Sequence, residues 1–212
     1  MMAHSPVDDF EKDLRTRSLE WVANHYIFEG TPYIFRDRPE IVNMLSTHLS
    51  RQLELSSENI RIIGSAKVGF SLSPDNFPRE FSNTSDIDVL VVDEKLFDEI
   101  WMSVLNWHYP RRLSGLGRVD SCWMSARRND LYWGWFHPDR IKYKGLSLPE
   151  VLKPLRDIST SWFNAFRSLS RYPEFSGRHV SGRLYRSWSH ARLYHLDALR
   201  KIKETVLNVT GG

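Results

Sequence analysis

The sequence predicts an α+β fold in which a mixed β-sheet is flanked by helices, with helical segments at both ends of the chain. Apolar residues recur at three- and four-residue steps over residues 8–28 and 38–54, which is the spacing of one helix face. A short β-branched run at residues 60–63 and an almost unbroken apolar run at residues 87–92 are typical of strands. Because the second run lacks polar alternation, we expect that strand to be buried on both faces.

The region after the second strand carries further patterns. Asp93 has the side chain of an N-cap, and the apolar spacing that follows predicts a helix that ends near Pro110. Aromatic and β-branched residues on both sides of a polar tetrapeptide then predict a β-hairpin, with strands at residues 119–126 and 131–136. Helical spacing returns after the hairpin, and we expect two further helices, over residues 155–169 and 182–207.

These patterns divide the chain into three expected parts: an N-terminal helical segment (1–58), a core with the strands (59–145) and a C-terminal helical segment (146–212). Basic residues gather in the second half. Eight Lys/Arg stand against three Asp over residues 111–144, and seven against one over residues 178–203. We therefore expect this half to face a polyanion, either a nucleoside triphosphate or a nucleic acid. The alternative is a solvated basic helix face.

Composition excludes several classes of protein. The 212 residues are 41% apolar, which is enough for a packed core and argues against general disorder. The single cysteine, Cys122, cannot form an intramolecular disulfide or a zinc site with several cysteines. No apolar run approaches the roughly 18 residues of a membrane-spanning helix, and the first residues lack the pattern of a signal peptide. We expect a cytoplasmic protein without membrane contact.

The residues with the clearest chemistry are two aspartates at the start of the second strand. Alternation places Asp86 and Asp88 on one strand face, with Ile87 on the other, so both carboxylates can converge on one point. Two such charges favour a hard divalent cation such as Mg²⁺, which keeps open positions for phosphate. Gly64-Ser65 follows the first strand, where free N–H groups and a hydroxyl can hold phosphate oxygens. Either motif alone is common in surface turns, but each directly adjoins a strand.

This arrangement resembles the DNA polymerase β-like nucleotidyltransferase superfamily over roughly residues 60–136. A strand, Gly-Ser, a helical turn and then a strand that starts Ser-Asp-x-Asp is the signature of that superfamily. Gly64, Ser65, Asp86 and Asp88 match it residue by residue. The fold that the resemblance implies is a nucleotidyltransferase-like mixed sheet flanked by helices.

The resemblance also implies a metal-dependent enzyme. Members use two Mg²⁺ ions, with Mn²⁺ as the alternative, and transfer a nucleotide from an NTP to an acceptor hydroxyl with release of pyrophosphate. The implied metal ligands and catalytic residues are Asp86 and Asp88, and the implied nucleotide-binding residues are Gly64, Ser65 and Ser85. ATP is the nucleotide expected first. RNA, protein and nucleotides all occur as acceptors in the superfamily, so the acceptor stays open.

The sequence departs from the family pattern in two respects. The linker between Gly64-Ser65 and Asp86 is longer than in small members, which predicts an inserted loop beside the site. The third carboxylate of the family is not marked by a sharp motif. Asp120 is the first choice as third metal ligand and catalytic residue, because it begins the next expected strand after the helix, and Asp130 and Asp139 are the alternatives.

Further nucleotide contacts are expected from basic and aromatic residues. Lys67 would lie in the first turns after Gly64 and neutralise triphosphate charge, unless it is an ordinary surface lysine. Arg183, Ser187, His190 and Tyr194 recur at three- or four-residue steps in the last expected helix. That face could stack a base and pair with phosphate, with Arg183, His190 and Tyr194 as nucleotide ligands. An ordinary polar flank is the alternative.

Three functions are compatible with these patterns. The leading hypothesis is a nucleotidyltransferase that modifies RNA, protein or a nucleotide, similar to toxin–antitoxin and antiviral-defence components of bacteria. The second is a catalytically inactive module of the same fold that binds a nucleotide or a partner, favoured by the unmarked third carboxylate. The third is nucleic-acid binding without catalysis, which would weaken steeply with added salt.

Overall fold

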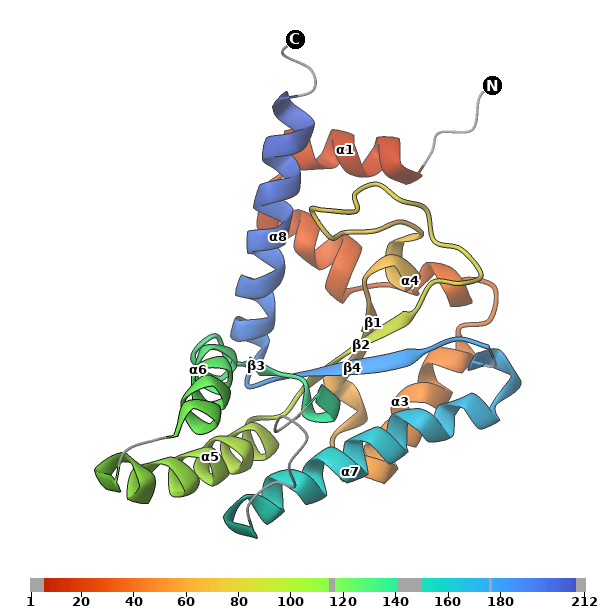
Figure 1. The fold of residues 1–212 in the computed structure, drawn as a ribbon. Helices are drawn as coiled ribbons and strands as arrows, with labels where there is room; N and C mark the ends of the chain where they lie inside the picture. The colour runs from red at the N-terminus through yellow and green to blue at the C-terminus, as the bar shows by residue number, and fades with distance from the viewer. Residues whose placement is uncertain (1–5, 115–116, 141–149, 176, 209–212) are drawn as a thin grey trace, which may run out of the picture.

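The computed structural model describes residues 6–114, 117–140, 150–175 and 177–208, and in these a four-stranded mixed sheet lies at the centre (Figure 1). β2 and β4 are parallel, and the edge strands β1 and β3 are each antiparallel to their neighbour. The spatial order is β1-β2-β4-β3. The α+β class and the mixed sheet predicted from the sequence are confirmed. The strands are β1 (Ile60–Ile63), β2 (Ile87–Val92), β3 (Trp135–Phe136) and β4 (Val180–Tyr185).

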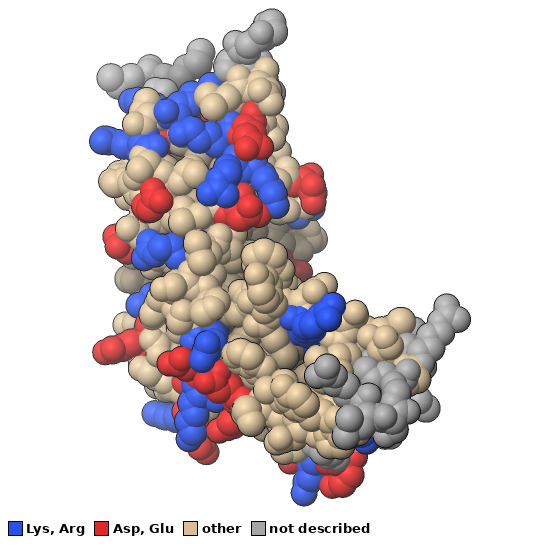
Figure 2. Space-filling view, turned by 90° about the vertical axis from the view of Figure 1, so that its left-hand side faces the viewer, with Lys and Arg blue, Asp and Glu red and all other residues tan. Residues whose placement is uncertain are grey.

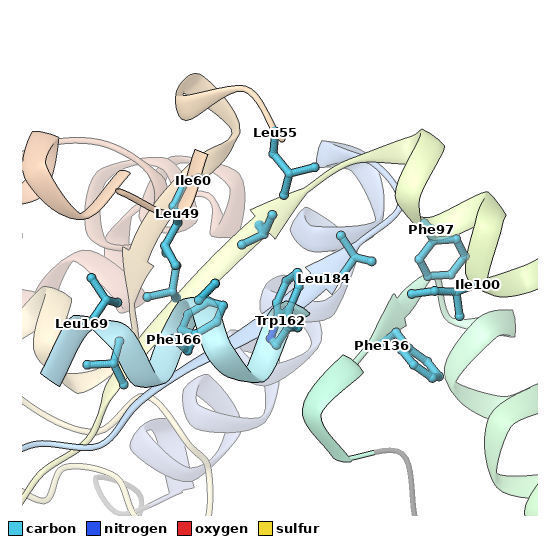
Figure 3. Close-up of a cluster of buried hydrophobic side chains, with 14 of the residues drawn as sticks. Leu49, Leu55, Ile60, Phe97, Ile100, Phe136, Trp162, Phe166, Leu169 and Leu184 are labelled. Atoms are coloured by element: carbon cyan, nitrogen blue, oxygen red, sulfur yellow. The ribbon is translucent and has the colours of Figure 1, made fainter. Parts of the chain in front are cut away.

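Three long helices cover one face of the sheet: α3 (Glu40–Leu53), α5 (Glu94–Ser114) and α7 (Lys153–Ser168). Alternate strand residues on this face are buried against them. Figure 3 shows part of this cluster, in which Trp162 and Phe166 of α7 and Leu184 of β4 take part. The larger of the two hydrophobic cores therefore lies between these helices and the sheet.

The opposite face is covered by N-terminal helices and the last helix. These are α1 (Pro6–Thr16), α2 (Leu19–Ala23), the π-helical turn η1 (Asn24–Phe28) and α8 (Trp188–Asn208). In Figure 1, α8 runs from the end of the sheet near β3 toward α1. Arg15 of α1 donates to the carbonyl oxygen of Val206 at 2.9 Å, which ties the two ends of the chain together. On this face the first residues of β2 and β4 border a cavity.

The remaining elements are short, apart from α6. Several expected helix boundaries hold: α3 and α7 match the predicted helices, and the backbone N–H of Leu96 donates to the Asp93 side chain at 2.7 Å, as an N-cap requires. Among the described residues, no helix has the length and apolarity needed to cross a membrane. The other elements are α4 (Ser65–Val68), α6 (Arg118–Tyr132) and single 3₁₀ turns at Tyr33–Phe35, Ser57–Asn59, Pro138–Arg140, Glu150–Leu152, Leu169–Arg171 and Pro173–Phe175.

The predicted β-hairpin over residues 119–136 is wrong. Most of that segment forms α6, and only Trp135–Phe136 forms a strand. The aromatic and β-branched composition suggested strands, but the buried residues Trp123 and Leu131 lie eight residues apart, which is two four-residue helical steps. Trp123 packs edge-on against Trp107 of α5, with ring centroids 5.0 Å apart. Tertiary packing therefore makes this segment helical, although its composition favours a strand.

The ends of three predicted helices also need correction. The helix predicted for residues 182–207 begins only at Trp188, because Val180–Tyr185 pairs with β2 as β4. The helix predicted for residues 8–28 breaks at Ser18, whose hydroxyl caps α2 by accepting from the backbone N–H of Trp21. The helix expected to end near Pro110 continues to Ser114.

Gly182 should be essential for packing α7 against the sheet. A Cβ at this position would lie 2.2 Å from the Phe166 ring, so the buried ring has to move. We expect Gly182→Ala to lower the free energy of unfolding by about 1–3 kcal/mol, the usual range for overpacking a core, in a urea titration. Gly117→Ala is the matched control, since nothing beyond its own neighbours along the chain lies within 4 Å of its added Cβ. Unchanged stability of Gly182→Ala, or no recovery with Phe166→Leu added, would contradict this packing argument.

Candidate functional site

A cavity of about 830 Å³ lies over the first residues of β2 and β4. The turn after β1 forms one wall, residues of the 71–85 loop form a second, and α8 forms a third. The cavity collects polar groups from segments that are far apart in the sequence. Its lining includes Gly64, Ser65, Ser85, Asp86, Asp88, Ser181, Arg183 and Tyr194.

Gly64 brings the turn after β1 directly against a carboxylate. β1 pairs Ile63 with Asp88 of β2, so the next residue lies beside the Asp88 side chain. Gly64 has φ 67° and ψ −150°, a conformation that residues other than glycine rarely adopt. A Cβ on Gly64 would lie 3.0 Å from Asp88 Oδ2. The glycine is therefore required both by its backbone conformation and by the close carboxylate.

The helix that follows the expected phosphate-binding turn is shorter than the sequence predicts. α4 is a single turn, Ser65–Val68, so its peptide dipoles add little to the field at Ser65. What this turn offers a ligand is backbone N–H groups, the Ser65 hydroxyl and the open space over Gly64. Ser65 lines the cavity together with Gly64.

Asp86 and Asp88 both line the cavity. Ile87 and Val89 are buried on the opposite face of β2, so the alternation places the two carboxylates on the cavity side. Both aspartates are exposed. Ser181 Oγ lies 3.4 Å from Asp88 Oδ1, and His179 Nδ1 lies 3.8 Å from Asp86 Oδ2. Both carboxylates are thus exposed to solvent on the cavity side of β2.

The long linker forms a loop beside the cavity, and Arg178 holds its last part. Arg178 Nη1 donates to the carbonyl oxygens of Ser82 and Ser85 at 2.9 and 3.0 Å, and the guanidinium lies 4.9 Å from the centroid of the Phe81 ring. The backbone N–H of Ser82 donates to the Ser85 hydroxyl at 3.0 Å. Ser85 is therefore fixed within the loop, immediately before Asp86.

The strand predicted to carry Asp120 as third carboxylate is wrong, because residue 120 belongs to α6. α5 and α6 follow the far end of β2, whereas Asp86 and Asp88 stand at its start. Asp130 is also on α6 and pairs with Arg127 at 3.2 Å. Asp139 lies in the 3₁₀ turn that packs against α7. In register with Asp88, β4 supplies Ser181 in place of a carboxylate.

The donor set fits one magnesium ion better than two. Mg²⁺ is commonly held by one or two carboxylates, with water and phosphate oxygens at the other positions, and Asp86 and Asp88 provide such a pair. A second ion would need a further carboxylate. In the described part of the chain, no group of three or more His, Cys, Asp or Glu side chains is arranged to hold a metal.

Arg183 lies on β4, not on the helix predicted for it, yet it still meets Tyr194 at the cavity. Its guanidinium carbon lies 4.4 Å from the Tyr194 ring centroid and 4.9 Å from that of Trp135. Arg183 Nε donates to His137 Nε2 at 3.0 Å, and Nη1 donates to the Tyr185 hydroxyl at 3.3 Å. Strand and helix together therefore position a guanidinium against two aromatic rings that also contact each other.

Two expected nucleotide ligands lie elsewhere. Lys67 is buried, and its ammonium donates to the carbonyl oxygens of Glu29 and Gly30. It lines a second, smaller pocket that is separate from the large cavity. His190 Nδ1 lies 2.7 Å from the Ser187 hydroxyl, and its ring packs against Gly134. Neither side chain lines the cavity, so the structure does not bring them to Asp86 and Asp88.

Sequence reasoning did not assign several residues of the cavity to the site, among them Ser181, His137 and His195. Burial first, and Arg183 second, lower the pKa of His195 to about 3, so the imidazole is neutral near pH 7. The period-two alternation of Val180–Tyr185 was the signal for β4 and for Ser181. No local pattern marks His137 or His195.

The surface charge is mixed where the sequence predicted a basic half. Figure 2 shows a face on which Lys and Arg side chains are interspersed with Asp and Glu and form no uninterrupted basic patch. On α8, Asp197 Oδ2 lies 2.6 Å from Lys201 Nζ, and Asp197 Oδ1 lies 3.7 Å from Arg200 Nη1. Acidic neighbours thus offset part of the positive charge that the composition of this helix suggests.

The chain was compared with protein-family models, with curated proteins and with solved structures, and none of them matches it. The site is therefore interpreted from its own geometry.

Lys67 should make stability depend on pH. Burial first, and Arg61 second, lower its pKa from 10.5 to about 8 in the folded protein. Between these pH values the unfolded chain binds a proton that the folded chain has lost, so the free energy of unfolding rises with pH. We expect the stability of the wild type relative to Lys67→Met to increase by roughly 1–3 kcal/mol from pH 8 to 10. Urea titrations at several pH values measure it.

Lys153→Met, at the exposed start of α7, is the matched control and should show no such trend. A flat difference between wild type and Lys67→Met would mean that Lys67 keeps its proton throughout.

Proposed function

We propose that the cavity binds a nucleoside triphosphate as its magnesium complex and that the protein transfers the nucleotidyl group to an acceptor hydroxyl. The observation that carries this proposal is the contact between Gly64 and Asp88. It joins a turn without a side chain to a metal-binding carboxylate, so that phosphate and cation can be held within one small space. ATP is the nucleotide that we would test first.

The roles of the residues follow from their chemistry. Asp86 and Asp88 would hold the magnesium ion, which supplies Lewis acidity toward phosphate oxygens when it is bound. Gly64 leaves room for a phosphate against the backbone, and Ser65 can donate one hydrogen bond to it. Exposed carboxylates lose little solvation when they bind a cation, and the backbone N–H groups of the turn at Gly64 would orient the phosphate.

The pair of carboxylates gives the first test. We expect Asp86→Asn and Asp88→Asn each to weaken magnesium-dependent ATP binding at least tenfold, because each removes a charged ligand of the ion. Isothermal titration calorimetry with ATP, with and without Mg²⁺, measures this. Asp157→Asn on α7 is the matched control, since it removes an exposed carboxylate on the other face of the sheet. Undiminished Mg²⁺–ATP binding in the Asp86→Asn/Asp88→Asn double variant would overturn the assignment.

Gly64 and Ser65 should differ sharply in their contributions. Gly64→Ala would force a side chain into a left-handed backbone conformation and against Asp88, so we expect a loss of ATP affinity of at least tenfold. Ser65→Ala removes a single hydroxyl, for which about 1 kcal/mol, or roughly fivefold in affinity, is expected. Titration of each folded variant measures the two losses.

Gly30→Ala is the control for backbone strain. Gly30 also has a positive φ, 75°, but its added Cβ meets only Lys67 Nζ at 3.8 Å. It should lose stability without losing ATP affinity. Equal affinity of Gly64→Ala and the wild type would remove the phosphate cradle from the proposal.

A second candidate function is nucleotide binding without transfer. The observation that favours it is Ser181, which stands opposite Asp88 on β4 where a carboxylate would complete a site for two metal ions. An enzyme incubated with α-labelled NTP, Mg²⁺ and total cellular RNA or protein should label an acceptor and release pyrophosphate. A binding module should retain Mg²⁺–NTP affinity and release none.

A further inference from the structure

Arg183 is held rigidly at the wall of the cavity by groups that carry no negative charge. Its hydrogen bonds run to the His137 imidazole and the Tyr185 hydroxyl. The rings of Trp135 and Tyr194 lie over the guanidinium, at 4.9 and 4.4 Å. These contacts fix the plane of the guanidinium, and the bonds to His137 and Tyr185 use two of its five N–H donors.

Within the described residues, no ion pair joins Arg183 to a carboxylate. Burial raises the pKa of Asp130 on α6 and the charges of Arg127 and Arg183 oppose that rise, but the Asp130 carboxylate forms its ion pair with Arg127. A partly buried cation without an anionic partner is costly, because it has lost part of its solvation. An anion that enters the cavity would recover that energy. Arginine also matches phosphate well, because its planar fork can donate two parallel hydrogen bonds.

The position of Arg183 separates it from the metal-binding end. Arg183 is two residues beyond Ser181 on the same face of β4, and Ser181 is the residue in register with Asp88. Same-face residues of a strand lie about 7 Å apart, so the guanidinium and the carboxylate pair address different parts of a ligand. His137, which accepts from Arg183 Nε, lies just beyond β3, on the side of β4 away from β2.

We propose that Arg183 forms a second anion subsite of the cavity, which binds a phosphoryl group without a metal ion. That its natural ligand is a phosphate compound rests on the proposed function, whereas the subsite itself rests on the arginine. The phosphoryl group has two candidate sources: the tail of the bound nucleotide itself, or a phosphate carried by the acceptor molecule. Either source makes the substrate anionic at both ends of the cavity.

The test uses pyrophosphate with EDTA, so that no metal ion takes part. In a ¹H–¹⁵N spectrum of the wild type, the Arg183 Nε–H resonance, identified by its loss in Arg183→Lys, should shift saturably with pyrophosphate. Calorimetry should show at least a tenfold weaker affinity for Arg183→Met. Arg167→Met is the matched control, because Arg167 also lies over an aromatic ring, Phe163, but outside the cavity. Its affinity should equal that of the wild type.

The Asp86→Asn/Asp88→Asn double variant separates this proposal from the proposed function. It should lose Mg²⁺–ATP binding yet bind metal-free pyrophosphate as tightly as the wild type or more tightly, because two negative charges are gone. An Arg183 resonance that stays in place at saturating pyrophosphate would overturn the subsite, as would Arg183→Met binding within twofold of the wild type. The wild-type spectrum decides even if Arg183→Met does not fold.

A last measurement distinguishes the two sources of the phosphoryl group. Pyrophosphate is titrated again in the presence of saturating Mg²⁺–ATP. Loss of the Arg183 shift supports the nucleotide's own phosphate tail as the occupant. A shift that persists supports a separate, phosphorylated acceptor that binds together with the nucleotide.

Discussion

The register between β1 and β2 is the constraint on which the site depends. It places Ile63 opposite Asp88, so the chain leaves β1 directly against a carboxylate, and the positive φ at the next position favours glycine. A slip by one residue would turn the side chains of β1 to the other face and separate Gly64 from Asp88. Buried residues of β1 and β2 on both faces hold the register, so core packing and site geometry are one property of this strand pair.

β4 extends the same dependence to the other side of β2. One of its faces packs through Gly182 against Phe166 of α7, and the opposite face carries Ser181 and Arg183 to the cavity. Because alternate residues of one strand serve both faces, a change that moves α7 would also move the guanidinium relative to Asp88. The rest of the Arg183 environment comes from β3 and α8, which contact β4 at its edge and its end.

Sequence reasoning located the parts of the site that local chemistry marks. Gly64, Ser65, Asp86 and Asp88 adjoin strands whose apolar pattern is strong, and the structure brings all four to one cavity. Asp120 and Arg183 were assigned to the wrong elements, because composition favoured strands where α6 packs and a helix where β4 pairs. Lys67 is close in sequence to Gly64, but its side chain is buried and donates to the carbonyl oxygens of Glu29 and Gly30. The alternation of Val180–Tyr185 is compatible with a strand, but a local pattern does not say which distant segment a strand pairs with. Tertiary contacts therefore decided these positions.

The β2–β4 side of the cavity is electrostatically divided, whereas the loop side carries one residue of each charge, Arg79 and Glu80. The division along the strands limits what can occupy the cavity. Asp86 and Asp88 repel each other and any bare anion, whereas Arg183, held against the rings of Trp135 and Tyr194 and bonded to His137, attracts an anion. A simple cation would satisfy only the acidic end, and a simple anion only the basic end. In a phosphate chain with a bound divalent cation, the cation can meet the two aspartates while a phosphate further along the same molecule meets Arg183. The arrangement therefore selects for ligands that bring their own counterion, as magnesium complexes of nucleotides do.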